Sequence, residues 1–159
     1  MLGKPDAGWS RFEMGDVFCH LSDMTDVAGD WLEQAIHGLE TMRPFAVHGT
    51  LEPGRMVCAV SYWNCHIIVE SDGIVDRTRD DAEYETYNMS MLEFCRALHR
   101  DVTEDLEDWV RWIHYLGDDE EIERKIHAER REELQRLLDR LAELIREREE
   151  SFGPHRFFF

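Results

Sequence analysis

The 159-residue sequence lacks the motifs of the common enzyme classes. It has no GxSxG nucleophile elbow, no phosphate-binding P-loop, no glycine-rich dinucleotide turn and no HExxH zinc motif. Its four cysteines are Cys19, Cys58, Cys65 and Cys95, and none forms a CxxC pair. Because zinc signatures need spaced ligand pairs, we expect free thiols, no metal and no cofactor. These absences favour a protein without catalytic residues.

Long apolar runs are also absent. No stretch approaches the roughly 20 apolar residues that a membrane helix needs. The first residues, MLGKPDAGWSRF, lack the apolar core of a signal peptide. We therefore expect a cytoplasmic protein that has no membrane partner.

Basic residues are scarce relative to acids. Lys and Arg number 18 against 35 Asp and Glu, which gives a net charge of −17. Such a field repels nucleic acid and attracts basic proteins. The alternative explanation is solubility alone. The segment 43–80 carries a net charge of only −1, and the strand patterns fall in this segment.

Hydrophobic residues make up 43% of the chain, which is enough for one domain with a proper core. Residues 9–21 alternate as a strand, or as a short hairpin that turns at Gly15-Asp16. A meander follows, with a type II turn expected at Pro53-Gly54 and either a turn or a bulge at Trp63-Asn64. The predicted meander strands are 44–51, 55–62, 65–70 and 74–78, the last after an Asp72-Gly73 hairpin signal.

Two Cys-His pairs fall within these strands, at Cys19-His20 and at Cys65-His66. Successive side chains of a strand point to opposite faces, so neighbours in a regular strand cannot bind one ion together. Cysteine packs readily as a small hydrophobe. We therefore interpret these cysteines as core residues.

The remaining segments have helical periodicity. Thr25 is a plausible N-cap for the first helix, and Ser90 with Glu93 forms a capping box for the second. The second helix extends to Gly117, with a break near 101–103 if Thr103 caps a second piece. We predict an α+β fold: an antiparallel sheet of four or five strands, one helix packed on it and a C-terminal helical hairpin. Residues 1–117 form the core domain, 118–151 the C-terminal helix and 152–159 an apolar tail.

The C-terminal helix carries a short seam of apolar residues with coiled-coil spacing. Its members are Leu134, Leu137, Leu138, Leu141, Leu144 and Ile145. The seam is too short for a stable isolated coiled coil, so it packs either on the core or on a second copy. We favour the homodimer, because packing within the chain leaves part of the seam and the Phe157–Phe159 tail uncovered.

Two tryptophans, Trp31 and Trp112, lie off the main apolar stripes of their helices. Partly exposed tryptophans on an acidic background favour a protein-binding surface, and the alternative is that they cover the edges of the core. Four acids share a nearby helical face: Asp101, Glu104, Asp105 and Asp108. We assign the two tryptophans and these acids to partner binding, although charged faces are usually only solvated. Cys95 and His99 have the spacing of half a zinc site, but Cys95 lies on the apolar stripe.

In size, acidity and layout the chain is similar in outline to small immunity proteins that neutralise bacterial toxins, with no shared motif. This similarity implies a non-enzymatic module that binds a basic toxin or another basic protein. The first alternative is a self-associating structural or regulatory protein. The second alternative is an enzyme with a Cys/His or metal site.

Overall fold

The computed structural model describes residues 1–70, 82–113 and 119–152. In these residues the elements, in chain order, are β1 (Trp9–Met14), β2 (Val17–Ser22), α1 (Val27–Thr41), β3 (Phe45–Thr50), β4 (Arg55–Val60), β5 (Cys65–Glu70), β6 (Ala82–Tyr87), α2 (Met91–Glu104), α3 (Leu106–Val110) and α4 (Glu120–Phe152). They form the α+β fold that the sequence predicts, with every strand pair antiparallel. None of the described helices is long and apolar enough to span a membrane.

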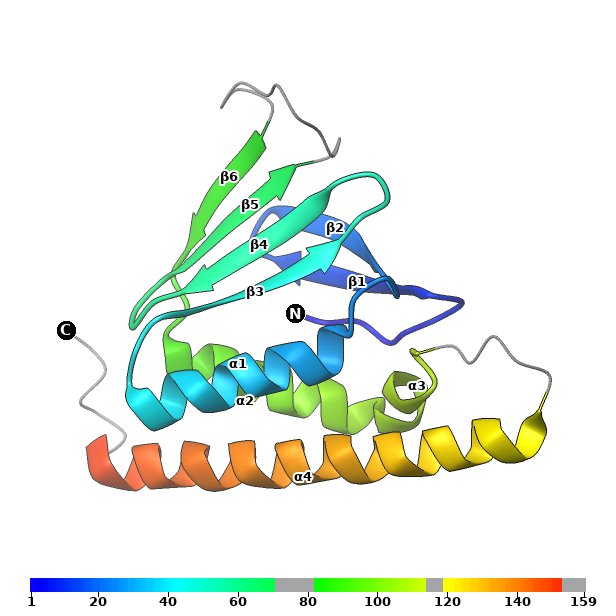
Figure 1. Cartoon of the computed structure of the whole chain (residues 1–159). Coiled ribbons are helices and arrows are strands. Elements are labelled where there is room, and N and C mark those ends of the chain that lie inside the picture. The colour runs from blue at the N-terminus through cyan, green and yellow to red at the C-terminus, as the bar shows by residue number, and fades with distance from the viewer. Residues whose placement is uncertain (71–81, 114–118, 153–159) are drawn as a thin grey trace.

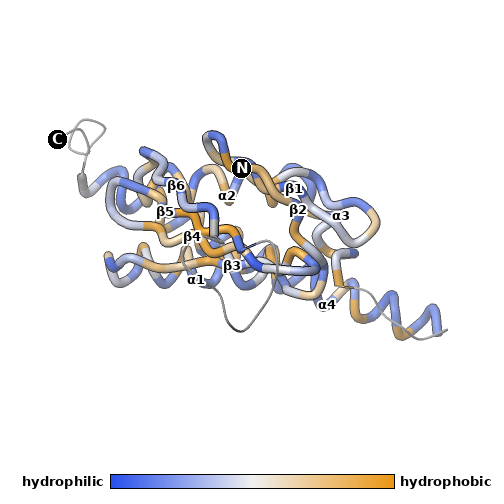
Figure 2. The backbone as a smooth tube through the Cα atoms, turned by 90° about the horizontal axis from the view of Figure 1, so that it is seen from above, coloured by the Kyte–Doolittle hydropathy of each residue, from blue (hydrophilic) through white to orange (hydrophobic). Residues whose placement is uncertain are grey.

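Strands β1 and β2 form a hairpin that turns at Gly15-Asp16, which confirms the hairpin alternative. Strands β3, β4, β5 and β6 form a separate four-stranded meander in that order. One face of the meander is buried, with Met56, Cys58 and Ile67 fully inaccessible to solvent. Figure 2 shows the hydrophobic backbone segments concentrated in the central strands.

The turns of the meander differ in part from expectation. Trp63-Asn64 lies in the β4–β5 turn rather than in a bulge, since Ser61 N–H donates to the Asn64 carbonyl at 2.8 Å. The β3–β4 connection has a cis peptide at Glu52-Pro53, and Gly54 within it has φ +113°. The predicted strand 74–78 and the Asp72-Gly73 turn lie outside the described residues. Strand β6 was not predicted.

The helices form two layers beneath the sheets, with α1 and α2 next to the strands and α4 under both helices (Figure 1). The N-cap of α1 is Asp26 and not Thr25, because the Asp26 carboxylate accepts the Gly29 N–H. The capping box of Ser90 and Glu93 at the start of α2 is confirmed. α2 ends at Glu104, so the break lies slightly beyond the predicted one, and Asp105 precedes α3.

Helix α4 has its leucine seam buried within the single chain. Leu134 and Leu141 are fully inaccessible, while Leu137, Leu138 and Leu144 are at most 4% exposed. Ile145 packs partly buried against the same core. α4 contacts α1, α2 and α3, so these helices cover the seam. The expectation that these residues offer an open surface to a second copy is therefore wrong.

Candidate protein-binding site

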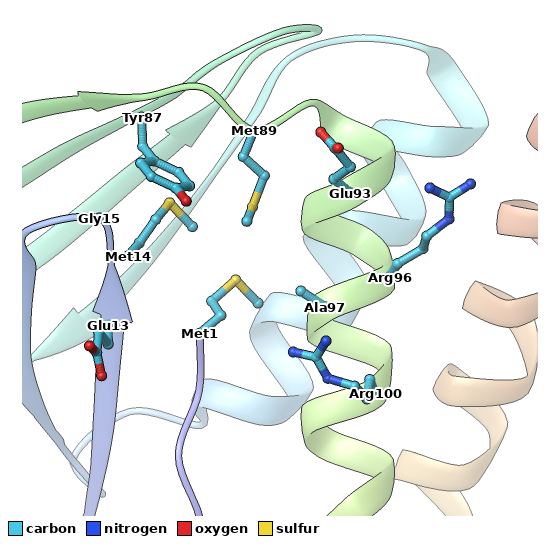
Figure 3. Close-up of a pocket in the computed structure, with 10 residues that line it drawn as sticks. All are labelled: Met1, Glu13, Met14, Gly15, Tyr87, Met89, Glu93, Arg96, Ala97 and Arg100. Carbon is cyan, nitrogen blue, oxygen red and sulfur yellow. The ribbon is translucent and has the colours of Figure 1, made fainter. Parts of the chain in front are cut away.

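A pocket of about 590 Å³ opens where the β1–β2 hairpin, the end of β6 and α2 meet. Its lining comes from segments far apart in the sequence: Met1, Glu13, Met14, Gly15, Tyr87, Met89, Glu93, Arg96, Ala97 and Arg100. Figure 3 shows the side chains of Met1, Met14, Met89 and Tyr87 directed toward a common centre. We call this feature the methionine pocket. Methionine side chains are flexible and polarizable, so such a lining adapts to apolar groups of different shape.

The turn of the hairpin places Tyr87 at the edge of the pocket. Gly15 has φ +60°, and a Cβ atom there would lie 2.8 Å from a carbon of the Tyr87 ring. A side chain at this position would therefore be strained and would displace the ring. The glycine both permits the turn and allows the hairpin to approach β6 closely.

The charged groups around the pocket already have partners. Arg96 Nε donates to Glu149 at 2.7 Å, and in Figure 3 its side chain points toward α4. Arg100 donates to Asp101 through Nε at 2.9 Å and through a terminal nitrogen at 2.6 Å. Glu93 accepts hydrogen bonds from the Ser90 N–H and hydroxyl, which lower its pKa. The two guanidinium charges are thus matched by carboxylates, and the apolar part of the lining is made by the methionines, Ala97 and the Tyr87 ring.

An acidic row extends from the pocket along β6. Glu83, Glu85 and Tyr87 alternate along the strand and therefore share the face that lines the pocket. Glu83 and Glu85 are exposed and make no ion pair with another described residue. Glu83 lies close enough to β2 for its charge to act on Cys19, where burial first and then Glu83 raise the thiol pKa to about 11. We call Glu83 and Glu85 the acidic row.

The opposite face of β6 carries the uncharged side chains of Tyr84 and Thr86. His66 of β5 contacts the Tyr84 hydroxyl through Nδ1 at 2.9 Å and Thr86 Oγ1 at 3.2 Å. The His66 and Tyr84 rings stack with their centroids 6.3 Å apart. β6 therefore presents acids on one face and hydroxyl groups that contact His66 on the other.

The two tryptophans assigned to partner binding are core residues. Trp31 is fully buried, and its indole N–H donates to the His48 carbonyl at 2.8 Å. Trp112 is 2% exposed and donates to the Thr25 carbonyl at 2.8 Å. The expectation of partly exposed tryptophans is wrong, because both lie inside the core rather than on a partner surface or at the core's edges. The aromatic contacts of Trp31, such as Phe12 with ring centroids 5.8 Å apart, join segments far apart in the sequence and cannot be predicted from it.

The four acids assigned to the same surface do not form one open face. Asp101 is buried, and it accepts the Leu2 N–H at 2.9 Å besides its contacts with Arg100. Asp108 is half-buried and pairs with Lys4 at 3.2 Å and Arg111 at 2.9 Å.

Of the other two acids, Asp105 lies half-buried at the junction of two helices, and only Glu104 is exposed. The break between α2 and α3 thus disrupts the helical face on which the prediction relied.

The cysteines lie as the strand alternation predicts. Cys19 and Cys65 are buried, whereas His20 is exposed and His66 half-buried on the opposite faces. A hydrogen bond with the Cys65 thiol, together with burial, raises the pKa of Cys58; burial chiefly raises that of Cys95. Within the described residues no three His, Cys, Asp or Glu side chains gather in a group that could hold a metal ion. Thiols with raised pKa values stay protonated near neutral pH and are poor nucleophiles.

Comparison of the chain with protein-family models, with curated proteins and with solved structures finds no match in any of the three. The fold and the site define the chain as an α+β protein that has a methionine-lined pocket next to an acidic edge strand.

Proposed function

We propose that this chain is a non-enzymatic protein-binding module that captures a basic partner protein at the methionine pocket and the acidic row. One observation carries the proposal: the methionine pocket adjoins exposed carboxylates that have no cationic partner among the described residues. An apolar side chain of the partner anchors in the pocket, because buried apolar anchors dominate interface energetics. Basic side chains of the partner pair with Glu83 and Glu85 at its margin.

The charge of the whole chain supports the same partner class. A net charge of −17 produces a negative field that accelerates the encounter with a basic protein. Arg96 and Arg100 do not oppose this encounter locally, because Glu149 and Asp101 compensate their charges. An immunity-type role, in which the chain neutralises a basic toxin in the cytoplasm, is one concrete form of the proposal.

The test is affinity capture from the native host with three bait proteins, each checked first for correct folding. The first bait is the wild type, and the second is the acidic-row variant Glu83→Lys, Glu85→Lys. The third is a control variant with the same change in net charge, Glu123→Lys, Glu132→Lys, on exposed positions of α4. Mass spectrometry should identify a basic protein that the wild type and the control retain and the acidic-row variant loses. Equal retention by all three baits would contradict the assigned site.

A further inference from the structure

Strand β6 has one edge with which no described strand pairs, and we call it the free edge. It pairs with β5 on one side, and no described strand pairs with it on the other; Figure 1 shows it at the margin of the sheet. The unpaired N–H and C=O groups of such an edge can accept an additional strand. The Tyr87 carbonyl already accepts the Met89 N–H at 3.0 Å. The edge that is open to a new strand therefore extends from Ala82 to Thr86.

The two faces of β6 would give such a strand a defined side-chain pattern. Side chains of an added strand alternate between faces, as those of β6 do. On one face they lie beside Glu83 and Glu85 and continue toward Tyr87 and the methionine pocket. On the other face they lie beside Tyr84 and Thr86, whose side chains are uncharged and contact His66. The matching segment is basic and then apolar on one face and uncharged on the other.

We propose that an extended basic segment of the partner adds to the free edge of β6 as a fifth strand. Two of its basic side chains, two residues apart, lie beside Glu83 and Glu85, and an apolar side chain two residues further enters the methionine pocket. This inference rests on the proposed function and specifies how the partner binds.

Electrostatics favours a basic extended segment at this edge over a second copy of the chain or a nucleic acid. A second copy of the chain that paired through β6 would bring its own Glu83 and Glu85 close to the same residues, and like charges across strands are destabilising. A nucleic acid strand would meet the same repulsion from its phosphates. A basic extended segment gains both the backbone hydrogen bonds and the charge pairing.

Short synthetic peptides test the inference on the unmodified protein. The probes are acetylated and amidated peptides of sequence Thr-Lys-Thr-Lys-Thr-Phe-Thr and its reverse, since the strand direction is open. The control, Thr-Thr-Lys-Lys-Phe-Thr-Thr, has the same composition and charge but no alternation. One probe should bind about tenfold more tightly than the control by calorimetry. It should also slow hydrogen exchange at the β6 amides that point away from β5.

Methylation of alternate backbone nitrogens in the better probe separates strand pairing from charge attraction. Methylation of the N–H groups that face β6 should abolish binding, whereas methylation of the opposite set should preserve it. Equal binding of probe and control, absence of binding, or unprotected β6 amides would overturn strand addition. The proposed function would still stand if capture of the basic partner required Glu83 and Glu85. Retention of that partner by the acidic-row variant would contradict the proposed function, whatever the result for strand addition.

Discussion

At the residue scale, Arg130 is a buried basic residue that links two helices. Its side chain is 8% exposed, pairs with Asp26 at the N-cap of α1 and reaches Glu133 at 2.9 Å. Gly29 makes this approach feasible, because a Cβ atom there would lie 3.0 Å from the guanidinium. Burial raises the pKa of Asp26 more than the Arg130 charge lowers it, so desolvation offsets much of the attraction. The pair nevertheless ties α4 to the start of α1.

Replacement of Arg130 by alanine should lower the free energy of unfolding by about 3 kcal/mol, because Asp26 would be left largely buried without its cation. Urea unfolding monitored by circular dichroism measures this change. The control is Arg146→Ala at an exposed position of the same helix, where we expect less than about 0.5 kcal/mol. Equal small losses in both variants would show that the Arg130 contact does not stabilise the fold.

At the element scale, the hairpin, the capping box and the first three meander strands could be predicted because their signals are local. Gly15-Asp16 is a turn sequence, and Ser90 with Glu93 needs only a spacing of three. Strand β6 lacked such a signal, since AEYETY carries acids on the face that a core strand would make apolar. That departure from the usual pattern is what places the acidic row beside the pocket.

The tryptophan error has an element-scale cause. α1 lies between a sheet and two helices, so it buries more than one stripe, and Trp31 belongs to the second. Trp112 follows the end of α3 at Val110, where helical spacing no longer applies. The methionine pocket was equally hidden, because Met1, Met14 and Met89 meet only through tertiary packing.

The leucine seam gives a prediction about α4. Leu141→Ala should lower the free energy of unfolding by about 2–5 kcal/mol, because the fully buried side chain leaves a cavity. Ile122→Ala, at a 45% exposed position of the same helix, serves as the control and should change it by less than about 0.5 kcal/mol. Because the seam packs within the chain, Tm should not depend on protein concentration. A wild-type Tm that rises with concentration, and loses that rise in Leu141→Ala, would instead place the seam between copies.

His99, on α2, makes the α2–α4 contact sensitive to pH. Burial lowers its pKa below the ordinary 6.5, although a hydrogen bond to the Leu138 backbone and the Asp139 charge partly oppose this. The unfolded chain therefore takes up the proton at higher pH than the folded chain does. The contribution of neutral His99 to the free energy of unfolding is complete above about pH 6.5. It decreases as the pH falls from there toward the pKa of His99 in the folded chain.

Urea unfolding between about pH 7.5 and about pH 5 should show this loss in the wild type. His99→Gln should flatten the profile in that window, whereas His20→Gln, at an exposed position, should leave it unchanged. Because other groups also titrate in this pH window, the informative quantity is the difference between the pH profiles of the two variants. Identical pH profiles for His99→Gln and the wild type would contradict the role of His99 in the pH dependence of stability.

At the scale of the whole molecule, charge and shape act together. Asp26 and Asp101 pair with Arg130 and Arg100, so these pairs add nothing to the net charge, and the −17 comes from acids elsewhere on the chain. The acidic row remains available beside the pocket. The account therefore makes a local claim: where the acids lie determines partner capture more than their number does.

The rate of association with the captured basic partner, measured against salt concentration, tests this claim most directly. The wild-type rate should fall steeply as the Debye length shrinks from about 10 Å at 0.1 M to about 3 Å at 1 M. Glu83→Lys, Glu85→Lys should associate more slowly at low salt and with a shallower dependence, while Glu123→Lys, Glu132→Lys stays near the wild type. A rate that does not change with salt, or an equal loss in both variants, would contradict capture at the acidic row.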